Sequence, residues 1–145
     1  MNVVIRAGRD DDLELAIDWL GAAGLPTEDL TAAHMQDFLF ADAGGRGVGM
    51  VGLEHLGTVG LLRSLVVATD SRKSGVGAHL VAALERAARA RNINELWLLT
   101  IDADPFFARL GYVTRDRDAA PNLIRSTPEF STLCPDDAVL MHKRL

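Results

Sequence analysis

Two glycines, Gly75 and Gly77, follow the apolar run at residues 61–67 and precede a helical pattern. Glycine has no Cβ, so successive backbone N–H groups here can approach an anion closely. The N-terminus of the following helix adds the positive end of its dipole, and Arg72 and Lys73 add positive charge beside it. The chemistry that these residues favour is phosphate binding. The predicted loop consists of Arg72, Lys73, Ser74, Gly75, Val76, Gly77 and Ala78.

The spacing of this loop excludes two common phosphate-binding motifs. Position 80 is Leu80, whereas the dinucleotide fingerprint requires a third glycine. Ala78 and His79 follow Gly77, whereas the phosphate loop of nucleotide hydrolases requires Lys and then Ser or Thr. A glycine pair that only forms a tight turn is the alternative reading of the motif taken alone.

The neighbouring segments predict regular elements that position the loop. Apolar residues at helical spacing predict an amphipathic helix from about residue 75 to 92, and residues 95–100 form an apolar run typical of a buried strand. Pro105 fits the first turn of a short helix that Gly111 ends.

The N-terminal half of the sequence is expected to form the other side of the site, opposite the phosphate-binding loop. Residues 1–6 read as a strand, and residues 13–20 as a helix that one of three preceding aspartates can cap. A second short helix or a loop is expected to begin at residues 25–30. Two antiparallel strands are predicted at residues 38–42 and 47–54, with a turn between them.

From residue 61 to 112, the order of strand, glycine loop, helix, strand, short helix and Leu110-Gly111-Tyr112 resembles the acyl-CoA-binding half of the GNAT superfamily of N-acyltransferases. Residues 62–67 and Phe106-Phe107 are most similar to amino-acid N-acetyltransferases. The tail at residues 127–135 is similar to the arsenic-resistance-associated branch of that group.

This resemblance implies an α/β (α+β) fold, with a central mixed, mostly antiparallel sheet of about six to seven strands and about four flanking helices. It implies acetyl-CoA as co-substrate, with the backbone of Leu65, Val66 and Val67 bonding the pantetheine arm and the glycine loop wrapping the pyrophosphate. Phe107 stands where many members carry a tyrosine that protonates the leaving thiolate. Phenylalanine donates no proton, so we expect the thiolate to leave unaided or with help from water.

Removing a proton from the acceptor ammonium requires a base, and Glu54 is the predicted one. It ends the third predicted strand beside the expected acceptor cleft, and Leu53 and Leu56 can partly desolvate it. A solvated glutamate at a strand end is the alternative, and His55 is a second candidate base.

An amino-acid acceptor needs a partner for its carboxylate, and Arg63 is the predicted one. Strand alternation would place Arg63 on the same face as Leu65 and Val67. Arg125, from a tail segment expected to fold over the site, is the second candidate, although surface ion pairs would equally explain both arginines. Thr100 is predicted to contact the substrate or to cap the following loop.

Composition sets limits on partners and location. The 145 residues, 48% of them hydrophobic, suit a single domain over residues 1–145. A net charge of −5 argues against nucleic acid as the main partner, and the apolar stretches are too short for a membrane span. One cysteine, Cys134, fits a cytoplasmic protein and is too few thiolates to capture arsenite. We predict no metal site, and we expect residues 138–143 to offer a strand for pairing in a homodimer.

The sequence thus predicts an acetyl-CoA-dependent N-acetyltransferase for a small amino-acid-like amine, of the arsenic-resistance type. Acetylation of glutamate in arginine biosynthesis is an enzymatic alternative. A non-catalytic module that binds or senses acyl-CoA is the alternative from another class, and it follows from Phe107 replacing the tyrosine.

Overall fold

The computed structural model describes residues 2–72, 74–135 and 137–145, and within these ranges seven strands form one sheet. They are β1 (Val3–Ala7), β2 (Phe38–Ala43), β3 (Arg46–Leu56), β4 (Val59–Val67), β5 (Glu95–Thr100), β6 (Val113–Arg115) and β7 (Val139–Arg144). The strand order is β1-β2-β3-β4-β5-β7-β6, and only β4 and β5 pair in parallel. The predicted mixed, mostly antiparallel sheet is confirmed.

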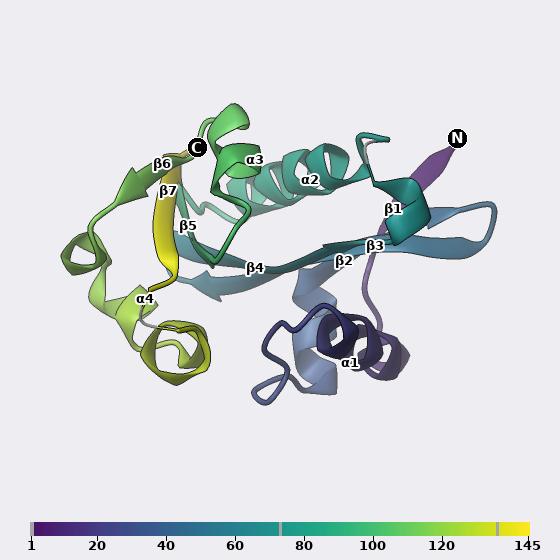
Figure 1. Cartoon of the computed structure of the whole chain (residues 1–145), viewed down its shortest axis with the longest axis horizontal. Helices are drawn as coiled ribbons and strands as arrows, with labels where there is room; N and C mark the ends of the chain where they lie inside the picture. The colour runs from purple at the N-terminus through teal and green to yellow at the C-terminus, as the bar shows by residue number, and fades with distance from the viewer. Residues whose placement is uncertain (1, 73, 136) are drawn as a thin grey trace.

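Helices lie on both faces of this sheet (Figure 1). The α-helices are α1 (Leu13–Ala22), α2 (Val76–Ala90), α3 (Asp104–Arg109) and α4 (Asn122–Arg125). The 3₁₀ segments are η1 (Asp10–Asp12), η2 (Ala32–Asp37), η3 (Thr69–Ser71) and η4 (Arg117–Ala119), and η5 (Glu129–Leu133) is a π-helical turn. As predicted, Pro105 lies in the first turn of α3, and Gly111 follows that helix with a φ of +97°.

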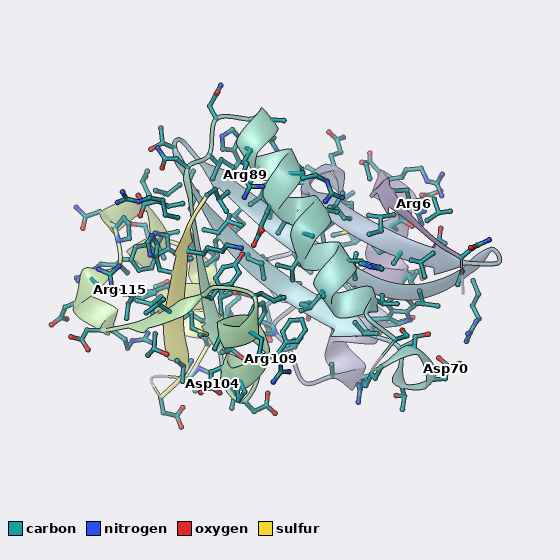
Figure 2. All side chains as sticks on the ribbon, turned by 90° about the horizontal axis from the view of Figure 1, so that it is seen from above. Arg6, Asp70, Arg89, Asp104, Arg109 and Arg115 are labelled. Carbon is teal, nitrogen blue, oxygen red and sulfur yellow. The ribbon has the colours of Figure 1, made fainter. Side chains whose placement is uncertain are left out.

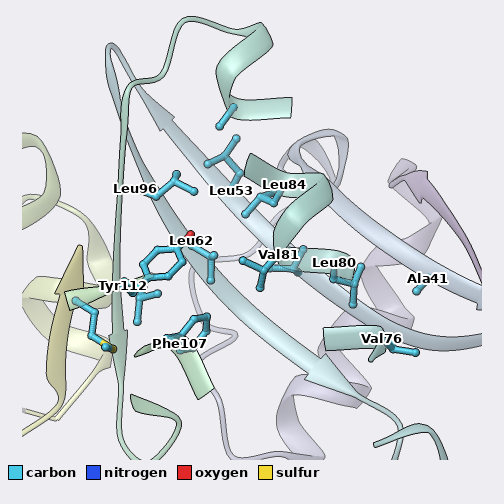
Figure 3. Packing of buried hydrophobic residues seen from close by; sticks show 14 of the residues in the cluster. Ala41, Leu53, Leu62, Val76, Leu80, Val81, Leu84, Leu96, Phe107 and Tyr112 are labelled. Carbon is cyan, nitrogen blue, oxygen red and sulfur yellow. The ribbon is translucent and has the colours of Figure 1, made fainter. Parts of the chain in front are cut away.

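The face covered by α2 contains the largest apolar cluster (Figure 3). Leu80, Val81 and Leu84 of α2 recur at helical spacing and pack against Leu62 of β4 and Leu96 of β5. Truncating one of these buried leucines to alanine removes about 2–5 kcal/mol of stability. This packing holds α2, and therefore its N-terminus, at a fixed height above β4.

Two smaller clusters lie on the opposite face. One joins Leu20 of α1 and Met35 of η2 to Phe38 of β2. The other joins Ile124 of α4 to Trp97 of β5. Figure 1 shows α1, η2, α4 and η5 all below the sheet, opposite α2.

Of the helix and the loop expected at residues 25–30, the structure shows the loop, and the next helical segment, η2, begins only at Ala32. One expectation requires correction. The strand β7 is not available for pairing in a homodimer, because it lies between β5 and β6 and its His142 is paired with both Trp97 and Val113. Both backbone edges of β7 are therefore used within the chain over residues 140–142, the middle of the strand.

None of the described helices combines the length and the apolar character that crossing a bilayer requires.

Candidate active site

A cavity of about 460 Å³ opens where β4 and β5 separate. The two strands pair only from Val59–Glu95 to Leu61–Trp97, and beyond Leu61 their backbones diverge. Leu65 of β4 and Thr100 of β5 line opposite sides of the opening. Along residues 62–67, the edge of β4 that faces β5 is therefore not used by β5.

A β-bulge in β4 accompanies this separation. Gly52 of β3 pairs with Arg63 and Met50 pairs with Val66, so the single residue Val51 faces two residues of β4. Ser64, one of those two, has a φ of 62°, in the left-handed region that serine rarely adopts. Its hydroxyl accepts a hydrogen bond from Nε of Arg63 at 3.0 Å, which ties the bulge to the neighbouring side chain.

The bulge also reverses which side chains share a face. Leu65 and Val67 pack against the apolar cluster between the sheet and α2, whereas Val66 packs against the cluster on the opposite face, between the sheet and α1. Simple alternation placed Arg63 on the face of Leu65 and Val67, and that expectation is wrong, because one extra residue shifts the alternation by one position.

The glycine loop leads from the end of β4 to the N-terminus of α2 (Figure 2). Gly75 precedes the helix with a φ of +87°, and no described side chain caps the helix there. The first N–H groups of a helix have no partner inside it, so those at and after Gly75 are directed at any ligand placed there. Nε of Arg72 donates to the carbonyl of Val67 at 3.2 Å, and the hydroxyl of Ser74 donates to the carbonyl of Ser71.

The predicted donor-binding residues lie along one path from the cavity to this loop. Leu65 and Phe107 line the cavity. Gly77 approaches the ring of Phe106, where an added Cβ would lie 3.3 Å from the ring edge. Lys73 lies outside the described residues. The remaining predicted positions on the path are Val66, Val67, Arg72, Ser74, Gly75, Val76 and Ala78.

Arg63 is one of the residues that line the cavity, but its side chain does not open into it as the sequence predicts. Its side chain is 0% exposed and is surrounded by carboxylates. Nη1 and Nη2 bond Asp29 at 2.5 and 3.0 Å, and Nη1 also bonds Glu54 at 3.2 Å. Nε lies 3.3 Å from a carboxylate oxygen of Glu129. The guanidinium is thus already paired with three carboxylates, which reduces its capacity to receive the carboxylate of an acceptor.

These contacts shift the titration of the carboxylates in opposite directions. Burial is the main cause that raises the pKa of Glu129 to about 7; the charge of Arg63 opposes this rise, and the charges of Glu54 and Asp29 add to it. Burial also opposes ionisation of Asp29, but its hydrogen bonds with Arg63 hold the pKa of Asp29 below its ordinary value. Glu54, the predicted base, is partly buried in this cluster and does not line the cavity itself.

The other predicted acceptor residues are divided by the structure. Thr100 lines the cavity, and its hydroxyl accepts a hydrogen bond from the backbone N–H of Ala103 at 3.0 Å. Arg125 lies away from the cavity and donates to the carbonyls of Ala120 and Asp118. His55 is exposed and bonds the carbonyl of Gly57 within its own turn.

Four residues of the site have no assigned role in the sequence pattern. Ser64 carries the bulge, Asp29 and Glu129 bind Arg63, and Cys134 lines the cavity with its thiol pKa raised to about 11 by burial. Because Asp29 and Glu129 are far from Arg63 in the sequence, no local spacing indicates these contacts.

Comparison with known proteins agrees with this geometry. A family model described as the acetyltransferase (GNAT) family matches residues 9–112. An uncharacterized N-acetyltransferase of Chlorobaculum tepidum is 33% identical over 93 residues, which are 63% of this chain and 59% of that relative. The chain thus spans less than two thirds of the length of this curated relative.

Solved structures share the fold at low sequence identity. N-acetylglutamate synthase from Neisseria gonorrhoeae, complexed with coenzyme A and N-acetyl-glutamate, has a TM-score of 0.86 at 21% identity over 100% of this chain and 35% of its own. Rv2747 from Mycobacterium tuberculosis, in complex with CoA and NLQ, has a TM-score of 0.83 at 22% identity, over 98% of this chain and 99% of its own.

Proposed function

The chain belongs to the acetyltransferase (GNAT) family, and from that premise we propose that it transfers the acetyl group of acetyl-CoA to the amine of a small acceptor. The observation that carries this proposal is the cavity between the separating strands β4 and β5, continued by the glycine loop and the N-terminus of α2. A pantetheine arm is narrow and rich in amides, which suits the open edge of a strand. A pyrophosphate suits the N-terminus of a helix.

Donor binding is assigned mainly to backbone groups. The edge of Leu65, Val66 and Val67 bonds the pantetheine arm, and Phe107 packs at the thioester end of the cavity. Residues 72–78 hold the pyrophosphate, with Lys73 included on sequence grounds alone. Backbone recognition predicts that side-chain changes along β4 are tolerated unless they fill the cavity or remove the bulge.

The transfer step forms an N–C bond and breaks the C–S bond. A backbone N–H of β4 polarises the thioester carbonyl while negative charge develops on its oxygen. Glu54 accepts the proton of the acceptor ammonium through water, because it does not itself reach the cavity. The thiolate of CoA leaves without an acid from Phe107, which a thiol pKa of about 8–9 allows, and the second proton of the amine reaches it through water as the amide forms.

An amino-acid-like acceptor is the substrate class that we propose. Two solved relatives support it, since one is complexed with N-acetyl-glutamate and carries the name of N-acetylglutamate synthase, and the other holds CoA and NLQ. Thr100 is the acceptor contact that the geometry favours, because its oxygen accepts from Ala103 and its hydroxyl hydrogen remains available for a ligand. The similarity of the tail to the arsenic-resistance branch makes an arsenical amino acid one candidate, and we place the reaction in the cytoplasm.

Two other functions each rest on one observation. Glutamate acetylation in biosynthesis follows from the resemblance in fold to N-acetylglutamate synthase. A module that binds acyl-CoA without turnover follows from Phe107, which has no proton to give.

Thiol release from acetyl-CoA, measured with glutamate, its phosphinic analogue and the arsenic counterpart as acceptors, separates these functions. Selective turnover of the analogues supports detoxification, and turnover of glutamate alone supports biosynthesis. Acetyl-CoA binding with no turnover of any amine supports the binding module.

Glu54→Gln tests the proposed base, and His55→Gln at the neighbouring position is the control. We expect Glu54→Gln to lower kcat by about 10²–10⁴-fold with acetyl-CoA affinity retained, and His55→Gln to leave both unchanged. Equal losses in the two variants would remove Glu54 from the mechanism.

A further inference from the structure

One buried guanidinium joins four segments of the chain. Arg63 in β4 contacts Asp29 from the loop after α1, Glu54 from β3, Glu129 from η5 and the bulged Ser64. Removing the charge of a buried group that is paired in this way leaves its partners uncompensated in a low dielectric. Moving a partner away from Arg63 therefore costs free energy, and this cost holds each partner in place.

Two of these partners, Asp29 and Glu129, adjoin chain segments that line the cavity. The loop wall, which we define as residues 23–28, is followed directly by Asp29. The tail wall, which we define as residues 133–135, continues the η5 turn that begins at Glu129. In Figure 1 both walls lie below the sheet, on the face opposite α2. The side chain of Arg63 contacts the segments that carry both walls, through Asp29 and through Glu129.

The walls have little regular structure to hold them. Residues 23–30 contain no helix or strand, and the tail wall begins at Leu133, the last residue of η5, and leads towards β7. Segments of this kind depend on a few long-range contacts for their position. Asp29 and Glu129 lie 34 and 66 positions away from Arg63 in the sequence.

We propose that Arg63 is a positioning residue that fixes both walls of the cavity, the loop wall through Asp29 and the tail wall through Glu129, and that it does not bind the acceptor. Its effect on catalysis rests on the proposed function, whereas its effect on the walls does not. An acceptor that fits the cavity is then recognised by walls whose separation Arg63 sets.

The tail wall contains a thiol whose rate of chemical modification measures how often the wall opens. Cys134 is the single cysteine of the sequence and lines the cavity within that wall, half-buried. A thiol reagent that forms a coloured product modifies it faster whenever the tail wall opens. The reaction needs neither an acceptor nor turnover, so it reads the wall separately from the enzyme activity.

Glu129→Ala removes the anchor of the tail wall, and Glu85→Ala is the matched control. Glu85 is also a buried glutamate, but it pairs with Lys143 and Tyr112 under α2, away from the cavity. We expect Glu129→Ala to raise the modification rate of Cys134 at least about tenfold, as a loss of about 1.4 kcal/mol of local stability would. Glu85→Ala is expected to change it less than about twofold under the same native conditions. Glu129→Gln retains a carbonyl oxygen and should restore most of the protection.

Asp29→Ala tests the other wall. It should leave the modification rate of Cys134 close to that of the wild type and raise KM for the acceptor more than it lowers kcat. Equal Cys134 rates in Glu129→Ala and Glu85→Ala, or no increase in Glu129→Ala, would overturn the proposal. If Cys134 responds as expected but no amine is acetylated, the proposed function fails and the role of Arg63 stands.

Discussion

The hydroxyl of Tyr112 donates a hydrogen bond to the carboxylate of Glu85 at 2.9 Å, and both side chains are buried. Nζ of Lys143 completes the cluster with bonds to both carboxylate oxygens of Glu85. Burial first, and then the charge of Glu85, raise the pKa of Tyr112 above its ordinary value. Tyr112 is therefore part of the packing between α2 and β7, and we expect it to take no part in protonating the leaving thiolate.

Tyr112→Phe should change stability and leave catalysis unchanged. The variant loses one hydrogen bond to a buried carboxylate, which we expect to lower the free energy of unfolding by about 1.5–3 kcal/mol. Urea denaturation measures that loss, and the pH profile of kcat for the two proteins provides the control. A profile that loses its alkaline limb only in the variant would assign Tyr112 to the chemistry instead.

Ionisation of Glu129 should lower stability as the pH rises. Its pKa is raised in the folded protein from 4.5 to about 7, so between these values the folded state binds a proton that the unfolded state has lost. This contribution to stability is fully present below pH 4.5, falls as the pH rises, and is lost above about pH 7. The groups that face Glu129 are Arg63, Glu54, Asp29 and Cys134.

The difference in unfolding free energy between wild type and Glu129→Gln isolates this effect, because glutamine resembles the protonated acid. We expect the wild type to lose about 2–3 kcal/mol relative to the variant between pH 4.5 and 7.5. The aspartates with lowered pKa values, such as Asp29, act in the opposite direction in both proteins and largely cancel. A difference that does not change with pH would mean that the pKa of Glu129 is the same in the folded and unfolded states.

The sequence predicts the donor side of the site because its signals are local. An apolar strand, two glycines and an amphipathic helix follow one another over residues 61–92, and glycine at position 75 matches the left-handed φ found there. Packing of the helix on the strands then needs only the apolar spacing.

The acceptor side could not be predicted in the same way. Ser64 is an ordinary residue in an apolar strand, and its left-handed φ is imposed by the pairing with β3 and the contact with Arg63. The bulge then changes the face of Arg63, and the partners of Arg63 come from a loop and from the tail. Each of these facts depends on contacts between distant segments, which a single sequence does not reveal.

Gly75→Ala should weaken acetyl-CoA binding with little effect on acceptor binding. The added Cβ meets no atom within 4 Å, so the strain comes only from the φ of +87° and should cost about 1–2 kcal/mol locally. That cost moves the first N–H groups of α2 away from the pyrophosphate. Calorimetric titration with CoA should show about a tenfold or larger rise in Kd. Pantetheine, which lacks the pyrophosphate, should bind the wild type and the variant equally. Equal weakening for both ligands would place the defect elsewhere.

Substitutions of Ser64 test whether the bulge, rather than the serine side chain, shapes the cavity. Ser64→Gly removes the left-handed strain, worth about 1 kcal/mol, but also the acceptor for Nε of Arg63, so its net stability should change little. Ser64→Val adds a β-branched side chain to the same φ and should cost about 2–3 kcal/mol.

Acetyl-CoA affinity distinguishes these two effects. Because glycine keeps the bulge, Ser64→Gly should hold Kd for acetyl-CoA within about threefold of the wild type. Valine favours a regular strand, in which Leu65 would turn to the other face and β4 would close towards β5. Ser64→Val should therefore lose at least about tenfold in affinity while still folding. If the glycine variant loses affinity as strongly as the valine variant, the hydroxyl of Ser64, and not the bulge, holds the donor site open.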